Sequence, residues 1–168
     1  FGQVGLGRPA TAQNFDAQLL LLLEQYNREP FIVLECESKR VGNVYLPDRL
    51  CDAMRTGRRV LIRSGIDTRV RRLIAEYTDV LQPQDPQIIT SITSLTKRLG
   101  KKKVAGLLLD YEEGRLTEFT RTLLADYYDP LYGYETASPE SFDLVVEAED
   151  LDRAATEISQ YIDRLIRG

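Results

Sequence analysis

Apolar residues recur at two spacings along this chain, and the spacing divides it into expected helices and strands. After Thr11, a suitable N-cap, residues 13–26 place apolar side chains at helical intervals, at Phe15, Leu19, Leu22 and Leu23. Helical patterns also follow Pro47, Asp85-Pro86 and Asp150, which suit the start of a helix. The first two of these helices are expected to end at Gly57 and near Gly100. Further helices are expected over 66–81, capped by Asp67 or Thr68, and over 101–114 and 116–132, separated by Gly114.

Three short segments are continuously apolar instead, which is typical of buried strands. They cover residues 31–36, 60–62 and 142–148, and each is bounded by charge, Gly or Pro. Strands buried on both faces favour a parallel sheet with helices on each side. Because strands alternate with helices, the fold class predicted is α/β, and the more polar helices from about 85 to 135 are expected to form a helical insert.

Composition narrows the chemistry. The 168 residues fit one domain, the net charge is −4, and no histidine is present, which removes Ser-His and Cys-His catalysis and most zinc sites. Cys36 and Cys51 form no metal or redox motif, and no apolar run is long enough to cross a membrane, so we expect a cytoplasmic protein without membrane contact. The opening FGQVGLGRPAT lacks methionine and indicates the middle of a longer protein.

Opposed charges gather where the first two expected strands end. Glu35 and Glu37 close the first, and Arg63 and Ser64 close the second, followed by three arginines of the next helix, Arg69, Arg71 and Arg72. In parallel α/β sheets ligands bind at the carboxyl ends of strands, where carboxylates hold Mg²⁺ or act as bases and arginines clamp phosphate. A phosphorylated small-molecule substrate fits this pattern, and so do ordinary solvated loop charges.

Two further clusters each have two interpretations. A basic turn, which contacts either a nucleic-acid backbone or only solvent, comprises Lys97, Arg98, Lys101, Lys102 and Lys103. The segment YYDPLYGY, residues 127–134, holds four tyrosines that either stack on bases or pack on the core of a helix end.

Three stretches together resemble the C-terminal half of tRNA 2-selenouridine synthase. They are GQVGLGRPATAQNFDAQL, VLECESKRVGNVYLP and LLADYYDPLY, and the resemblance covers nearly the whole chain. Members of that family join a rhodanese domain to a P-loop domain. They convert the wobble 2-thiouridine of tRNA to 2-selenouridine with selenophosphate, and they also attach a geranyl group from geranyl diphosphate to the sulfur.

The resemblance implies roles for the charged residues. Glu35, Glu37 and Arg40 would be catalytic, and phosphate would be bound by Ser38, Arg63, Arg69, Arg71 and Arg72. The basic turn would bind tRNA, with Mg²⁺ as a candidate cofactor. The Walker A sequence and the rhodanese cysteine loop are absent from these 168 residues, so we expect them upstream of Phe1 and expect this piece alone to be inactive.

Two alternatives remain open at this stage: a P-loop small-molecule kinase-like enzyme, and a non-enzymatic tRNA-binding module built on the helical insert. Both enzyme hypotheses place a missing central strand between residues 31–36 and 60–62. Those two strands should then lie two strand spacings apart, roughly 9–10 Å.

Overall fold

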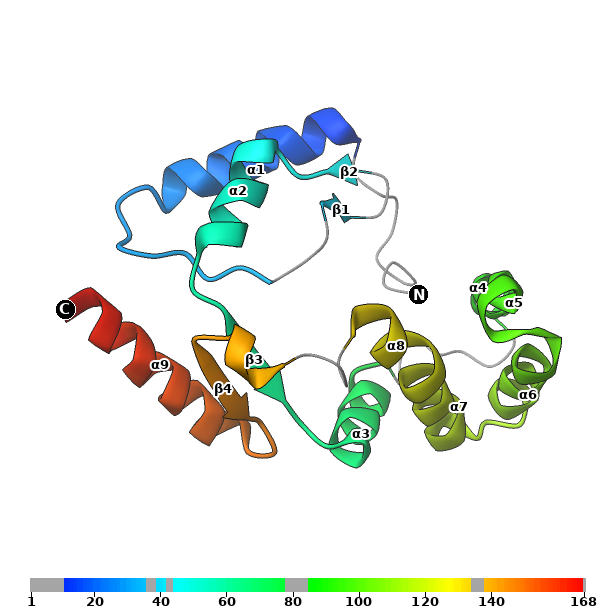
Figure 1. Ribbon diagram of the computed structural model, residues 1–168. Helices are drawn as coiled ribbons and strands as arrows, with labels where there is room; N and C mark the ends of the chain where they lie inside the picture. Colours follow the sequence, from blue (N-terminus) through cyan, green and yellow to red (C-terminus); the bar gives the residue numbers. More distant parts are fainter. Residues whose placement is uncertain (1–10, 36–38, 42–43, 78–84, 134–137, 168) are drawn as a thin grey trace.

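The computed structural model describes residues 11–35, 39–41, 44–77, 85–133 and 138–167, and helices dominate it (Figure 1). The helices are α1 (Ala12–Gln25), α2 (Asp48–Thr56), α3 (Ile66–Tyr77), α4 (Pro86–Ser94), α5 (Thr96–Leu99), α6 (Lys101–Glu112), α7 (Leu116–Leu123), the π-helix η1 (Leu124–Tyr128), α8 (Asp129–Tyr132), the 3₁₀-helix η2 (Pro139–Ser141) and α9 (Leu151–Arg167). The strands are β1 (Arg40–Val41), β2 (Val44–Tyr45), β3 (Val60–Arg63) and β4 (Leu144–Glu147). The chain is therefore α/β with a small sheet, as predicted.

The second and third expected strands pair with each other in parallel. β3 runs beside β4 with Val60 opposite Leu144 and Arg63 opposite Glu147. Val146, Ala148 and Ala154 are fully buried between β4 and α9, with Ile158 packed against them. Asp150 caps α9 by accepting the backbone N–H of Arg153, as its position before the helix predicted.

A carboxylate anchors the starting end of this strand pair. Asp143 accepts the backbone N–H of Arg59 at 2.7 Å and a guanidinium N–H of Arg58 at 2.9 Å. These hydrogen bonds lower the pKa of Asp143, the backbone bond most of all. The bond from Arg59 links residues 84 positions apart in sequence, so it fixes where β4 meets β3.

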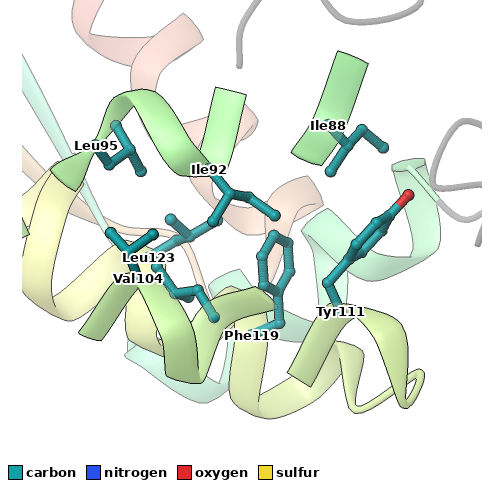
Figure 2. Packing of buried hydrophobic residues seen from close by; sticks show 8 residues of the cluster. Ile88, Ile92, Leu95, Val104, Tyr111, Phe119 and Leu123 are labelled. Atoms are coloured by element: carbon teal, nitrogen blue, oxygen red, sulfur yellow. The ribbon is translucent and has the colours of Figure 1, made fainter. Parts of the chain in front are cut away.

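The segment from α4 to α8, which lies between β3 and β4 in sequence, has a core of its own. Figure 2 shows Ile88 and Ile92 of α4, Val104 and Tyr111 of α6, and Phe119 of α7 around one interior. The backbone N–H of Asp85 donates to the Tyr111 hydroxyl at 3.1 Å, which gives this buried phenol a partner. Helix α3 packs on α7 and connects this helical unit, residues 85–133, to the strand pair.

Local signals set the ends of the helices in this unit. Asp85 accepts the backbone N–H of Gln87 at 2.7 Å and precedes Pro86 at the first helical position, as expected. Gly100 has a φ of 81° and Gly114 a φ of 70°, conformations that favour glycine and that end α5 and follow α6. One cap prediction is wrong: α3 begins at Ile66, before Asp67 and Thr68, and Gly65 accepts its first helical bond from Arg69.

The strand predicted over residues 31–36 is wrong for the part that the structure describes. Residues 31–35 enter no ladder, and their apolar side chains are exposed, from 45% at Phe31 and Ile32 to 70% at Val33. A strand needs a neighbouring strand for its backbone hydrogen bonds, and among the described residues β3 pairs only with β4. The expected arrangement of two strands flanking a third therefore does not occur in the described chain.

The two helices of the surrounding N-terminal region bury no residue among those that the structure describes. Helix α1 spans the predicted range but buries no residue, and Leu22, expected to face inward, is 49% exposed. Helix α2 begins after Pro47 and ends at Gly57 as predicted, and it too buries no residue. An unpredicted antiparallel hairpin, β1–β2, pairs Arg40 with Tyr45. No helix in the described part of the chain is both long and apolar enough to cross a membrane.

Candidate functional site at the carboxyl end of the strand pair

The carboxyl ends of β3 and β4 are joined by the side chain of Glu149. This carboxylate accepts the backbone N–H of Gly65 and the hydroxyl of Thr68, so it occupies the N-terminal end of α3. A side chain at position 65 would place its Cβ 3.2 Å from the Glu149 carboxylate, which would then have to shift by a few tenths of an ångström. The two hydrogen bonds, led by that from Thr68, lower the pKa of Glu149.

Two of the predicted phosphate-binding arginines, Arg71 and Arg72, belong to this junction. A guanidinium N–H of Arg72 donates to the backbone carbonyl of Glu149 at 3.0 Å, and Arg71 donates to the Thr68 hydroxyl at 3.3 Å. Arg63 ends β3 at the same edge of the sheet, opposite Glu147. The structure thus brings Arg63, Arg71 and Arg72 to one end of the strand pair, where the charges of Arg72 and Arg71 also help to lower the pKa of Glu149.

Arg69 lies in a different environment from the other arginines. Its two terminal nitrogens donate to the two carboxylate oxygens of Asp129 at 2.6 and 2.8 Å. The pair is largely buried, with Asp129 only 6% exposed. Such a fork-on-fork ion pair occupies the geometry that a phosphate would need. In this structure Arg69 therefore joins α3 to the start of α8.

The predicted catalytic residues lie in the N-terminal region. Glu35 is exposed at the end of the unpaired segment, and Arg40 in β1 places its guanidinium 5.9 Å from the Tyr45 ring centroid. Glu37 and Ser38 lie outside the described residues. Lys39 beside them forms an exposed ion pair with Asp48 at 2.6 Å, and this partner raises the pKa of Lys39. The catalytic and phosphate-binding assignments stay predictions.

Metal ligands do not gather in the described residues. No group of three or more Asp, Glu or Cys side chains in that part of the chain could hold a metal ion. Cys51 is a free thiol, half-buried in α2. One or two carboxylates together with substrate phosphates can also hold Mg²⁺, so Mg²⁺ stays a predicted cofactor.

The basic turn is exposed on α5 and on the first turn of α6. Lys101, Lys102 and Lys103 occupy the N-terminal end of α6, where the helix dipole disfavours cations. These three lysines therefore do not suit their helix end, whereas Lys97 and Arg98 lie in the last turn of α5, where cations are favoured. Lys103 forms an ion pair with Asp126 of η1, with its Nζ 2.9 Å from a carboxylate oxygen.

Two functional candidates, Asp129 and Glu149, were missed by the sequence reasoning. Glu149 follows the expected strand 142–148, and acidic residues after a buried strand were the signal used for Glu35 and Glu37. The same signal at the end of the expected strand 142–148 would have indicated Glu149. Asp129 carries no such signal, because its partner Arg69 is 60 residues away in sequence.

A small parallel strand pair with helices around it and arginines at its carboxyl end is consistent with a P-loop-like AAA domain. The family model described as tRNA 2-selenouridine synthase AAA domain matches residues 1–164. The chain belongs to this family, and the resemblance seen in its sequence is confirmed.

Individual relatives support the same family. A tRNA 2-selenouridine synthase of Alcanivorax borkumensis is 26% identical, over 80% of this chain and 44% of the relative. Those of Shewanella woodyi and Psychromonas ingrahamii are 28% and 29% identical, over 80% and 62% of this chain and 44% and 35% of the relatives. The chain thus spans less than half the length of these curated relatives. No solved structure matches it.

Proposed function

We propose that this chain is part of a tRNA-modifying transferase that converts wobble 2-thiouridine to 2-selenouridine. The observation that carries the proposal is the family match over residues 1–164, together with relatives named tRNA 2-selenouridine synthase. The proposed partners are tRNA and a small phosphorylated substrate, and the oligomeric state is left open.

The proposed route has two steps, with geranyl diphosphate and selenophosphate as substrates. In the first, the thiouridine sulfur attacks the first carbon of the geranyl group, a C–S bond forms, and diphosphate leaves with the electrons of the broken C–O bond. The proton that the thiouridine ring nitrogen loses passes to a base. In the second, the selenium of selenophosphate bonds to the base carbon that carries the geranylated sulfur, and geranyl thiol leaves with the electrons of the broken C–S bond and a proton. Water then cleaves the Se–P bond, so that phosphate is released and 2-selenouridine remains. The nucleophile of the first step belongs to the RNA, so this chain needs none.

The residues of this chain would act mainly by positioning and by stabilising the charge on the leaving group. We assign that role to Arg63, Arg71 and Arg72, which the strand pair brings to one edge, and to Arg40 of the N-terminal region. Glu37 would instead act as a base. Ser38 and Glu35 complete the proposed set. Arg69 is the weakest member, since Asp129 already engages both ends of its guanidinium.

We further propose that a strand and a phosphate loop from a part of the protein outside these 168 residues complete the sheet. Two observations support this. Apolar side chains are exposed at Phe31, Ile32, Val33 and Leu34, and they would be covered if this segment were a buried strand. In addition, β3 has a described partner on one side only. The relatives are more than twice as long as the part that matches this chain. The helical unit would then be an insert in a P-loop-like domain.

The experiment is mass spectrometry of wobble nucleosides in tRNA from cells with and without the full-length gene. We expect 2-selenouridine to disappear on deletion and to return when the full-length gene is supplied. Unchanged 2-selenouridine in the deletion strain would contradict the proposal. An S-geranylated nucleoside that accumulates when selenophosphate is withheld would support the two-step route.

A further inference from the structure

Three tyrosines form a continuous row at the end of the helical unit. The rings of Tyr127 and Tyr128 meet edge to face with centroids 5.0 Å apart. Tyr128 and Tyr132 are nearly parallel, 10° apart, with centroids separated by 6.3 Å. Exposure rises along the row: Tyr127 and Tyr128 pack partly against the core of the unit, whereas Tyr132 is 63% exposed. The row therefore leads from the core to solvent.

Tyr127 and Tyr128 belong to η1, a π-helical turn that joins α7 to α8, and Tyr132 ends α8. The backbone N–H of Asp129 donates to the carbonyl of Leu124, five residues earlier, instead of four. Pro130 lacks an N–H, and its ring would clash with the carbonyl of Asp126 in a regular α-helix. π-Turns inside helices are rare and concentrate at functional sites. The bulge allows the helix to continue past Pro130 and to carry Tyr132 one turn beyond Tyr128.

Cations lie beside the row. The Arg98 guanidinium is 5.7 Å from the Tyr127 ring centroid, and α5, which carries Lys97 and Arg98, packs against η1. Lys103 reaches Asp126 of the same π-turn. From Pro86 to Leu109 the sequence holds five cations and no carboxylate. This surface combines positive charge with an exposed aromatic ring.

We infer that Tyr132 is a stacking platform for an unpaired nucleobase of RNA, whose backbone lies along the basic turn. Nucleobases present a π-face whatever their sequence, and stacking on an aromatic side chain combined with cationic backbone contacts is how single-stranded nucleic acid is held. A phosphate-only surface would need the lysines and no aromatic row. The inference rests on the proposed function, because it specifies how a tRNA substrate would be held.

The test compares single-stranded and double-stranded RNA oligonucleotides of equal length, binding to the full-length protein and to its variants. Tyr132→Ala should weaken single-strand binding roughly 5- to 150-fold, the range typical for loss of one stacked base. Tyr132→Phe keeps the ring and should bind like the parent protein. Tyr26→Ala, an exposed tyrosine at the end of α1, is the matched control and should change nothing.

A second readout detects the stack directly. These 168 residues contain no tryptophan, so Tyr132→Trp adds one indole. Its emission is the difference between the fluorescence of the variant and that of the parent protein. Saturating single-stranded RNA should quench that emission, and duplex RNA should not. An unchanged Kd for Tyr132→Ala, or unquenched emission at saturation, would overturn the inference.

Binding and modification are separable outcomes. If the nucleoside analysis refutes the proposed function while single-stranded RNA quenches the indole emission of the Tyr132→Trp variant, the platform stands and its substrate changes. If 2-selenouridine depends on the gene but Tyr132→Ala leaves both the Kd and the modification unchanged, the platform fails and the proposed function stands.

Discussion

The helical unit and the N-terminal region are similar in length and opposite in their packing. The helical unit buries Ile88, Ile92 and Leu107 almost completely among residues close to one another in sequence. The N-terminal region, residues 11–57, buries no residue of α1 or α2 and exposes the apolar segment 31–34. The helical unit forms its core from residues that are close in sequence. The N-terminal region carries apolar surface that needs a partner from elsewhere to cover it. We therefore expect the helical unit to bind RNA by itself. The N-terminal region should need a further part of the protein before it can take part in the reaction.

The largest expected effect compares one phenylalanine from each region. Phe119→Ala, at 2% exposure, should lower the free energy of unfolding of this chain by about 3–5 kcal/mol. Phe31→Ala, at 45% exposure, should lower it by about 0.5 kcal/mol or less. Urea unfolding of both variants measures the difference. In the full-length protein the cost of Phe31→Ala should rise if another strand covers it, and an equal cost in both proteins would contradict the proposed missing strand.

The buried ion pair between α3 and α8 should also matter for stability. Asp129→Ala leaves the Arg69 charge buried without its carboxylate and should cost about 3–5 kcal/mol. The double variant Arg69→Met with Asp129→Leu should recover most of that loss, because no buried charge remains. A double-mutant cycle by urea unfolding measures the coupling, and additive effects would show that the two side chains do not act as a pair.

The rate of tRNA modification should depend on the N-terminal region. In the full-length protein, Glu37→Ala and Arg40→Ala should each lower the modification rate roughly 10²-fold, because Glu37 would act as a base and Arg40 would stabilise the charge on the leaving group. Arg55→Ala, an exposed arginine of α2 paired with Asp52, is the control and should act like the parent. The 168-residue chain alone should show no turnover. Parent-like rates in both variants would remove these residues from the site.

The binding of tRNA should depend on the helical unit. Each cation of the basic turn that contacts a phosphate should contribute about 0.9 to the slope of log K against log salt. Replacing all five with glutamine should flatten that slope for tRNA, both in this chain and in the full-length protein. Titrations at several salt concentrations measure it. An unchanged slope would mean that the turn is merely solvated.

The smallest expected effect is a pH dependence at the strand-pair junction. Because hydrogen bonds from Thr68 and Gly65 lower the pKa of Glu149 in the folded chain, its stabilisation is present above its ordinary pKa of 4.5 and is lost as the pH falls through the folded value. Glu149→Gln should make the loss of stability below pH 4.5 shallower than in the parent. Asp143 and Asp48 also have lowered pKa values, but they are unchanged in the variant and cancel in the comparison. Identical acid profiles would contradict the assigned role.

What the sequence could predict follows the same division between local and distant partners. Asp85-Pro86, Gly100 and Asp150 mark helix ends through bonds within a few residues, and these predictions are confirmed. The strand at 31–36 depended on neighbours that no local pattern reveals, and it is wrong in the described residues. The arginines after β3 were expected at the sheet edge, but the links from Arg69 to Asp129 and from Thr68 to Glu149 span 60 and 81 residues. Sequence spacing alone could not show them.

The pairing of β3 with β4 has a consequence for how the chain folds. Arg59 and Asp143, which anchor this ladder, are 84 residues apart, so an unfolded chain must close a long loop before the first strand contact forms. Contacts of such high sequence separation slow folding. The helices between the strands are joined by short-range contacts and can form earlier, and once α7 packs on α3 the two strand sequences are held closer together. We therefore expect the helical unit to gain hydrogen-exchange protection first during refolding, with β3 and β4 protected in a later, slower phase.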